Sequence, residues 1–523
     1  MLTRLLMAGA ALACIASSGG AALCFPGAAA EIATLKLIVR DRASGKTVPA
    51  RVYLTNSAGG QWAPQGAITY EKGKESHFIT PGESRIELPA DRYRMVIEKG
   101  LEFRPVALAL ELGAGRVVEK TVEMSRWIHM NHLGWYSGDL HNHRRVEHMH
   151  QLLLAEELNL APTITDWIWE DKPVSTPPQT LSPVVRVDET HAYSVLDKEV
   201  ERLQQGPGAV DLLGLRKAIP FTGYWLGPPN DVFCRLAREQ GGWVDAEKIV
   251  WRDICALAAL GHIDFAGIVH NHFNRHGVEL ETDTWGMIPK ERQEFATAAG
   301  MPLWSMEVYY RFLNCGFRIP VSAGSASGVK SSPLGYNRVY VKMDQPFDYD
   351  GWFRALKAGR SFATNGPVLF LEANGRAPGQ SLQFSGVHAA KIRIHAESAS
   401  PRTQDRMEIL FRGRIIKTVT GANAGDRLTA DFEFPAEDTG WIAARSFERA
   451  GETVRFAHTS PVYVEIASRP GVVPEDARFF LKWIDRELDF YRKESRFRSE
   501  QDRLAMLSLF ERARAVYEKM AFP

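Results

Sequence analysis

The sequence predicts a multidomain fold of α/β plus β type, in which a central β/α region lies between two β-sandwich domains and precedes a helical tail. Apolar and polar residues alternate in residues 31–125 and again in 371–468, which is typical of half-buried strands. Between them, in residues 126–370, short apolar runs alternate with helical periodicity and favour a parallel α/β sheet or barrel. From 469 to 523, apolar residues recur at helical spacing.

Length and composition set the outer bounds. A chain of 523 residues is long enough for roughly two to four domains, each with its own core. A hydrophobic content of 45% and a charged content of 24% are ordinary for a globular protein. The net charge of +1 gives no general reason to expect nucleic acid or an anionic membrane surface as a partner.

The first thirty residues have the pattern of a secretory signal peptide. Arg4 supplies a positive start, residues 5–16 form an apolar run, and three alanines at 28–30 provide a small-residue cleavage site. We expect the mature protein to begin near Glu31 and to be periplasmic or secreted. No later stretch reaches the length of a membrane span, so none is expected in the mature protein.

Residues 31–125 are predicted to form a small N-terminal β-sandwich. Leu35, Leu37 and Val39 alternate with polar neighbours, and Gly- and Pro-rich turn signals separate this run from later ones. This region carries no group of titratable residues that suggests chemistry. It is therefore predicted to be a supporting domain.

The central region, 126–370, is predicted to alternate between strands and helices. The expected elements are a helix at 148–160, a strand at 162–167, a charged helix around 198–203, a short apolar run at 209–215, a mostly helical stretch at 232–260 and strands at 265–272 and 318–322. In parallel α/β folds, sites lie at the carboxyl ends of the strands. The polar motifs of this region fall at such predicted strand ends.

The last two regions return to β alternation and then become helical. Ile392 and Ile394, and later Val462 and Val464, alternate in 371–468, which predicts a C-terminal β-sandwich. Beyond it, charged sequence with apolar residues at helical spacing predicts a helical hairpin packed on the body. Its many arginines are better explained as a solvated face than as a nucleic-acid patch.

A His-x-His motif at a predicted strand end is the main chemical signal. On an extended backbone His141 and His143 point to the same side, and imidazoles are common metal ligands. A pair of structural histidines would explain the same motif, but its position at a strand end and the neighbouring Asp139 favour a metal site. His270 and His272 repeat the spacing at another strand end, where a satisfied structural pair and a ligand pair are both open.

These residues resemble a known family. Residues 138–143, Gly-Asp-Leu-His-Asn-His, are similar to the first motif of the PHP (polymerase and histidinol phosphatase) superfamily, in its secreted CehA/McbA-type (carbaryl hydrolase-like) branch. Residues 164–167, Ile-Thr-Asp-Trp, resemble the second motif, and the likeness extends over roughly 85–470. Further similar stretches are 309–328, 335–341 and 352–367. The resemblance implies a distorted β/α, PHP-like barrel and metal-dependent hydrolysis of an ester, carbamate or phosphoester.

The chain departs from the family pattern at ligand positions. Trp167 stands where the second motif has a metal-binding histidine, and Ala326 and Gly328 stand where a later motif has an aspartate and a histidine. Indole, methyl and hydrogen side chains cannot replace those donors. We therefore expect a reduced site for one divalent ion, Zn, Mn or Fe. The candidate ligands are Asp139, His141, His143, His270 and His272.

Four further residues are candidates for roles around that ion. Asp166 or Glu247 is a candidate general base, although Glu247 fits a surface acid as well. The small residues around Ser325 would let backbone N–H groups approach a substrate oxyanion. Arg338 would pair with an anionic substrate, or with a carboxylate of the protein itself in a structural salt bridge.

Two functions of different classes follow from this pattern. One is an exported metal-dependent hydrolase that acts on a small-molecule or glycan-linked substrate. The other is a non-catalytic binding or structural protein that keeps the barrel and holds a glycan or a partner. The surviving histidines favour the first, and the missing donors at 167, 326 and 328 favour the second.

Overall fold

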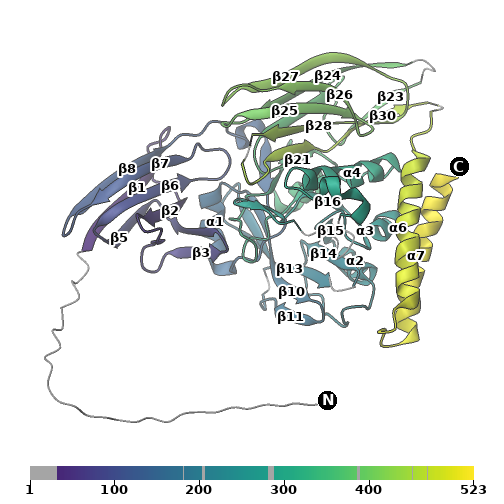
Figure 1. Cartoon of the computed structure of the whole chain (residues 1–523), viewed down its shortest axis with the longest axis horizontal. Coiled ribbons are helices and arrows are strands. Elements are labelled where there is room, and N and C mark those ends of the chain that lie inside the picture. The colour runs from purple at the N-terminus through teal and green to yellow at the C-terminus, as the bar shows by residue number, and fades with distance from the viewer. Residues whose placement is uncertain are drawn as a thin grey trace, which may run out of the picture.

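The computed structural model describes residues 32–180, 182–202, 206–280, 288–385, 389–449, 451–467 and 469–522. The predicted signal peptide, 1–30, lies outside the described residues. The chain is multidomain and mostly β, with several sheets and some helices. In Figure 1 the N-terminal sheets lie at one end, a green C-terminal layer lies above the central region, and two long yellow helices flank it.

The N-terminal region consists of two sheets around one core. The first has the order β5–β1–β8 and comprises β1 (Ile32–Asp41), β5 (Glu83–Pro89) and β8 (Val117–Met124). The second has the order β3–β4–β2–β6–β7 and comprises β2 (Ala50–Asn56), β3 (Ile68–Lys72), β4 (Glu75–Thr80), β6 (Asp91–Glu98) and β7 (Val106–Leu112). Alternate residues of β1, including Leu35 and Leu37, are buried together with Val52 and Leu54 of β2, as period-two patterning predicts.

The central strands form a closed barrel. The order around the ring is β9–β10–β13–β14–β15–β16–β19–β20, and β20 pairs with β9 to close it. The bounds are β9 (Trp135–Gly138), β10 (Leu160–Trp169), β13 (Ala192–Arg202), β14 (Gly208–Leu213), β15 (Trp243–Ala246), β16 (Phe265–Val269), β19 (Val321–Ala323) and β20 (Arg338–Lys342). Both orientations occur, because β10–β13 and β15–β16–β19 are parallel, whereas β13–β14–β15 and β20–β9 are antiparallel.

Helices and short strands connect the barrel strands. The helices are α1 (Met149–Glu156), α2 (Asn230–Glu239), α3 (Ile254–Ala259), α4 (Gly300–Asn314) and α5 (Tyr349–Lys357), with 3-10 turns at Asn131–Leu133, Val146–His148 and Lys290–Phe295. The short strands are β11 (Lys172–Ser175), β12 (Val184–Arg186), β17 (Phe273–Asn274) and β18 (Gly277–Val278). They surround one continuous hydrophobic core that also includes the barrel strands.

Two predicted elements of this region are wrong. The charged helix expected around 198–203 is part of strand β13, and the stretch expected to be mostly helical at 232–260 contains strand β15 between α2 and α3. The charges of β13 misled the prediction because they suggested a solvated face. Lys198 and Glu199 instead lie on opposite sides of a strand that is buried on both, and each has a buried partner.

The C-terminal region continues the hydrogen bonding of the barrel into a second pair of sheets. Strand β20 pairs with β21, β21 pairs with β29, and β29 leads to β28. The bounds are β21 (Ser361–Thr364), β22 (Val368–Ala373), β23 (Ser381–Phe384), β24 (Ala390–Ala399), β25 (Gln404–Phe411), β26 (Arg414–Thr420), β27 (Arg427–Ala436), β28 (Gly440–Glu448), β29 (Phe456–Thr459) and β30 (Val462–Ile466). A separate sheet, β22–β24–β27, covers the same core.

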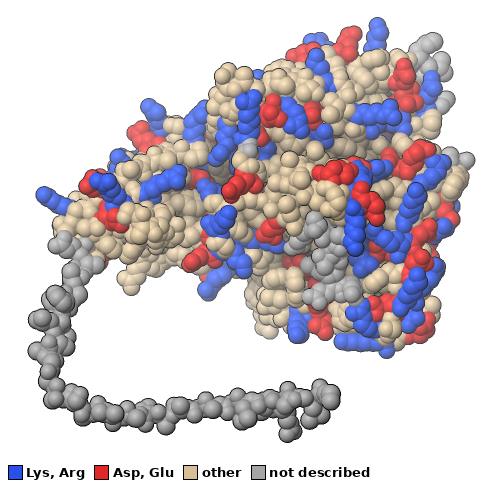
Figure 2. All heavy atoms as spheres, in the orientation of Figure 1, with Lys and Arg blue, Asp and Glu red and all other residues tan. Residues whose placement is uncertain are grey.

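The tail consists of α6 (Pro474–Lys493) and α7 (Glu500–Ala521), which pack against each other. Phe480 stacks on Phe312 of α4 at 4.3 Å between ring centroids, and Tyr517 donates a hydrogen bond to the carbonyl of Cys255 in α3. Figure 2 shows basic and acidic side chains mixed over these helices. Among the described residues, no helix combines the length and apolarity needed to cross a bilayer.

Candidate metal centre

Three side chains from two strand ends converge on one point. His141 and His143 follow β9, and Glu199 lies on β13. Nε2 of His141 is 2.9 Å from Nε2 of His143, and Oε2 of Glu199 is 3.6 Å and 3.2 Å from these two nitrogens. A point equidistant from the three atoms lies about 1.9 Å from each, close to the ~2.0–2.2 Å of zinc–imidazole and zinc–carboxylate bonds. The donor set therefore fits one divalent cation.

The backbone of the His-x-His motif is held by the loop at 324–328. Ala326 N–H donates to the carbonyl of His141, and His143 N–H donates to the carbonyl of Ser327, both at 2.7 Å. A Cβ on Gly324 would lie 2.4 Å from Cβ of His141, and one on Gly328 would lie 2.7 Å from the backbone of His143. Glycine is therefore required for this close approach, which aligns both imidazoles.

Asp139 fixes the turn that leads into the motif. Its two carboxylate oxygens accept backbone N–H groups from His141 at 3.2 Å, Ser325 at 2.9 Å and Gly335 at 2.7 Å. The side chain is fully buried, and its burial raises the pKa of the carboxyl while these hydrogen bonds lower it. Asp139 thus links the His-x-His segment to two points of the loop at 324–338.

The far side of His141 is bordered by more carboxylates. Its Nδ1 lies 3.4 Å from Oδ2 of Asp211 and 3.5 Å from Oε1 of Glu247. Glu247 is itself held by an ion pair with Lys248 and by N–H groups of Trp251 at 2.8 Å and Asn271 at 2.7 Å. A carboxylate behind a ligating imidazole orients the ring and increases its basicity.

The electrostatics of the cluster favour a cation. Burial lowers the pKa of His141, but Asp211 and Glu199 outweigh it and raise that pKa well above its ordinary value. Burial, and then the charge of Glu199, raise the pKa of Glu201, and burial raises that of Asp211 against the effect of His141. The negative charges of these carboxylates repel one another, and a divalent cation bound among them would reduce that repulsion.

Two members of the cluster, His141 and Glu199, line a cavity of about 320 Å³. Trp167, Trp169 and Trp251 form much of its apolar lining. The Trp167 ring lies 4.9 Å from that of His143, and its indole N–H donates to Glu201 at 3.1 Å. Trp167 therefore lines the cavity next to His143 and supplies no metal ligand. Lys72, Lys248 and Lys330 add positive charge to the lining.

The structure brings some predicted residues together and separates others. His272 lines the same cavity as His141, and burial followed by the charge of Lys248 lowers its pKa well below the ordinary value. His270 lies behind it, with Nε2 3.1 Å from the hydroxyl of Ser305. Asp166 lies outside the converging group and pairs with Lys198 at 2.7 Å.

Ser325 and Arg338, the two predicted substrate-binding residues, are engaged with the protein backbone. The Ser325 hydroxyl accepts from Asn337 N–H at 2.9 Å. Arg338 is almost fully buried and donates to the carbonyls of Gly335 at 2.7 Å and of Glu156 at 3.1 Å. Ser325 thus joins the two ends of the loop at 324–338, and Arg338 connects that loop to the end of α1.

The sequence reasoning missed Glu199, Glu201 and Asp211. Glu199 and Glu201 sit two residues apart on β13 and so share one face of the strand. That spacing is visible in the sequence, but interpreting 198–203 as a helix hid it. Asp211 on β14 is an isolated acid in an apolar run, which is the pattern of a buried carboxylate with a dedicated partner.

Comparisons with known proteins add little to this picture. No protein-family model matches the chain, and a search of curated proteins finds no match. Among solved structures, a match is the crystal structure of GBS52, the minor pilin in the Gram-positive pathogen Streptococcus agalactiae. It is 16% identical, with a TM-score of 0.16, and the match covers 19% of this chain and 46% of that chain. The chain thus matches less than half of that pilin, and so low a TM-score supports no inference about fold or function.

Proposed function

We propose that the protein is an exported metal-dependent hydrolase of ester, carbamate or phosphoester bonds with a PHP-like barrel and a reduced metal site. The observation that carries the proposal is the convergence of His141, His143 and Glu199 on one point, beside a cavity that His141 and Glu199 line. The PHP resemblance of the same His-x-His motif and the secretory pattern at 1–30 support it independently. Three protein donors would leave at least one position of a four-coordinate ion for water or substrate.

The residues around the centre have three different roles in this proposal: they hold the ion, orient His141 or accept a proton. His141, His143 and Glu199 would hold the ion, and Asp211 and Glu247 orient His141 from behind. When bound, a divalent ion supplies Lewis-acid chemistry, which polarises the scissile oxygen and acidifies water. Glu201 lines the cavity two residues from Glu199. Burial and the charge of Glu199 raise its pKa, so it would accept a proton only when a nearby cation lowers that pKa again. In this proposal Glu201 takes the general-base role.

The cavity lining indicates the kind of substrate. Tryptophan faces stack on flat rings, and three of them line this cavity. Lys248 and Lys72 would pair with a negative group on the same molecule. We therefore expect an ester or phosphoester that carries an aryl or sugar ring and a negative charge.

A direct test compares the mature protein with His143→Ala and Glu199→Gln. We expect the purified protein to contain about one equivalent of Zn, Mn or Fe, and to hydrolyse aryl esters or aryl phosphoesters in a chelator-sensitive reaction. Both variants should fold, lose the metal and lose turnover. Asp350→Asn, which changes a half-exposed acid of α5 that pairs with Arg216, is the control and should retain both. A protein that binds no metal, or turnover that survives both variants, would refute the proposal.

The binding-protein alternative rests on one specific observation. Ala326 and Gly328 pack directly on the His-x-His backbone, and Trp167 contacts His143, so none of these positions adds a donor to the centre. If the protein is a binder, it should take up a metal and a ring-bearing ligand with saturable affinity. None of the aryl esters or aryl phosphoesters would then be hydrolysed, whatever amount of metal the protein holds.

A further inference from the structure

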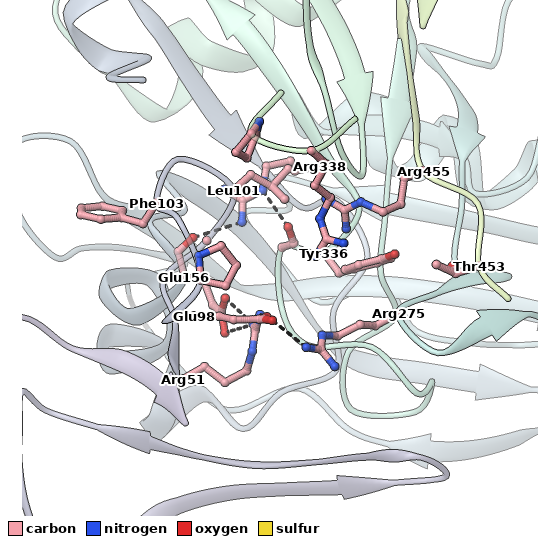
Figure 3. A pocket seen from close by; sticks show the side chains of 15 residues that line it. Arg51, Glu98, Leu101, Phe103, Glu156, Arg275, Tyr336, Arg338, Thr453 and Arg455 are labelled. Carbon is pink, nitrogen blue, oxygen red and sulfur yellow. Dashed lines mark hydrogen bonds and ion pairs between the residues drawn. The ribbon is translucent and has the colours of Figure 1, made fainter. Parts of the chain in front are cut away.

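A second cavity, of about 250 Å³, lies where the three β-rich regions meet (Figure 3). Arg51 and Glu98 reach it from the N-terminal sheets, Arg275 reaches it from the β17–β18 turn, and Arg455 reaches it from the C-terminal region. It shares no lining residue with the metal cavity. The two sites are therefore separate.

The lining of this cavity carries an excess of positive charge. Its acidic side chains, Glu98 and Glu156, are already engaged. Arg51 holds Glu156 and Glu98 at 2.5 Å each, and Arg275 holds the other oxygen of Glu98 at 2.6 Å. Figure 3 shows these ion pairs on one side of the cavity. The acids thus neutralise Arg51 and Arg275 and leave the remaining lining arginines without them.

The arginines on the other side of the cavity are Arg338, Arg402 and Arg455. Arg338 is about 1% exposed and donates to backbone carbonyls rather than to a carboxylate. Arg455 forms an ion pair through Nε with Oε2 of Glu448 at 2.6 Å. For the guanidinium of Arg402, no hydrogen bond or ion pair to a described residue is found. Buried or clustered like charges are costly unless an opposite charge joins them.

Repulsion within this group is evident in the properties of Arg402. The charge of Arg455, and then burial, lower the pKa of the Arg402 guanidinium. Tyr336 lies next to Arg455 in Figure 3, with its ring 5.8 Å from the Arg455 guanidinium carbon. Its phenol adds a neutral donor at the same place. Among the described residues, no carboxylate contacts Arg338, Arg402 and Arg455 together, so a negative group that binds several of them would balance their charge.

We propose that this cavity binds a small oxyanion, a phosphate, sulfate or carboxylate group, between Arg338, Arg402 and Arg455. The planar guanidinium group presents paired N–H donors that match the oxygens of such groups. The volume suits a small anion with its waters rather than a large ligand. Because its lining comes from all three regions, a bound anion stabilises their junction and the whole folded chain.

The test measures anion binding by calorimetry and by thermal unfolding of the full mature chain. Inorganic phosphate, sulfate and succinate are each titrated at constant ionic strength against chloride, with chelator present so that no metal holds the anion. We expect saturable binding by at least one of them and a rise in unfolding temperature with its concentration. The three probes distinguish phosphate, sulfate and carboxylate sources of the shared chemistry.

The exposed Arg402 allows variants that retain the fold. Arg402→Ala should weaken binding about tenfold or more, which is the loss expected for one charge-assisted contact. Arg402→Glu should abolish it. Arg414→Ala removes an exposed arginine of β26 outside the cavity and should bind as the wild type does.

The outcomes separate this proposal from the proposed function. His143→Ala should bind the anion as the wild type does, because it changes only the metal centre. The oxyanion site is overturned if no probe binds saturably, if Arg402→Glu binds undiminished, or if Arg414→Ala loses as much affinity as Arg402→Ala. Loss of hydrolysis with retained anion binding counts against neither the cavity nor its ligand class.

Discussion

His141 is the side chain on which the contacts of the metal centre converge. One ring nitrogen faces His143 and Glu199, and the other faces Asp211 and Glu247. An imidazole in this position is held in one orientation from both sides. In the proposed metal centre, affinity for the ion would therefore depend on Asp211 and Glu247, which are not among its ligands.

Asp211→Asn tests that dependence. Both its oxygens are buried, and its contact with His141 is the one through which it acts on the centre. Removing the charge should weaken divalent-metal binding by roughly 10–100-fold, as is typical of such outer carboxylates. Competition with a chromogenic chelator measures the dissociation constant.

The control for Asp211→Asn is Asp166→Asn. Asp166 is an acid of the barrel that pairs with Lys198 outside the trio. We expect this control to keep the wild-type affinity. Equal affinities in the wild type and Asp211→Asn would show that Asp211 does not support His141.

Asp139 has a structural effect that can be measured without metal. Its carboxylate accepts backbone N–H groups from three positions, and their loss would leave buried donors unsatisfied. Asp139→Ala should lower the free energy of unfolding by about 3 kcal/mol. Urea denaturation with chelator present gives this value. A change smaller than the error of the extrapolation would contradict the role assigned to Asp139.

At the scale of elements, the loop at 324–328 and the end of β9 act as one unit. The loop lies so close to the His-x-His motif that only glycine fits at 324 and 328. Small residues here are therefore a steric requirement of the site. The stretch is not a serine-hydrolase elbow, because its middle residue is Ala326 rather than serine.

Gly328→Ala measures that requirement, with Gly425→Ala as matched control. Both glycines have positive φ, +112° and +83°, so both substitutions carry backbone strain. Only Gly328 would place its new Cβ 2.7 Å from a backbone atom, whereas nothing lies within 4 Å of Gly425. We expect Gly328→Ala to lose about 1–3 kcal/mol and to weaken metal binding.

The control, Gly425→Ala, should lose about 1 kcal/mol and keep its metal affinity. Urea denaturation and chelator competition on the two proteins give both quantities. The same loss of stability and the same metal affinity in both variants would show that the contact between 328 and His143 is unimportant.

The whole molecule relies on its tail to cover the central core. Phe480 of α6 stacks on Phe312 and lies 5.0 Å from the ring of Tyr517 on α7. Phe480→Ala should destabilise the protein by about 3–4 kcal/mol, because it opens a cavity in a packed aromatic cluster. Leu504→Ala on α7, which is 57% exposed, is the control and should change stability by less than about 0.5 kcal/mol. Comparable unfolding midpoints for the two would contradict docking of α6.

One buried histidine, His458 of β29, makes the stability of the fold depend on pH. His458 is buried, accepts from the hydroxyl of Tyr310 at 2.8 Å, and donates through Nδ1 to the carbonyl of Thr459 at 2.7 Å. Burial lowers its pKa to about 3. The unfolded chain therefore takes up a proton below about pH 6.5 that the folded chain does not.

This contribution to stability is complete above pH 6.5 and is lost as the pH falls towards 3. By pH 5 the loss of stability amounts to about 2 kcal/mol. In His458→Gln the unfolding free energy should depend on pH less steeply between 6.5 and 5, by about one proton. Denaturant titrations at four pH values give the two slopes. Parallel slopes would show that His458 does not titrate differently in the two states.

Much of the architecture was predictable because local periodicity encodes it. Alternation in β1 predicted a half-buried strand, and helical spacing after 474 predicted the two tail helices. The His-x-His motif also indicated its own chemistry, because the spacing of two on a strand end places both imidazoles on one side. These features depend on neighbours in the sequence.

The sequence by itself thus determined the β-rich multidomain organisation and two of the three side chains that converge in the candidate metal centre. Only the tertiary structure decided that Glu199 joins them, that Asp166 turns to Lys198, and that arginines from three regions border one cavity. The physical reason is that these contacts join residues far apart in the chain. Strand order and register, which bring them together, depend on the packing of the whole core and not on local periodicity.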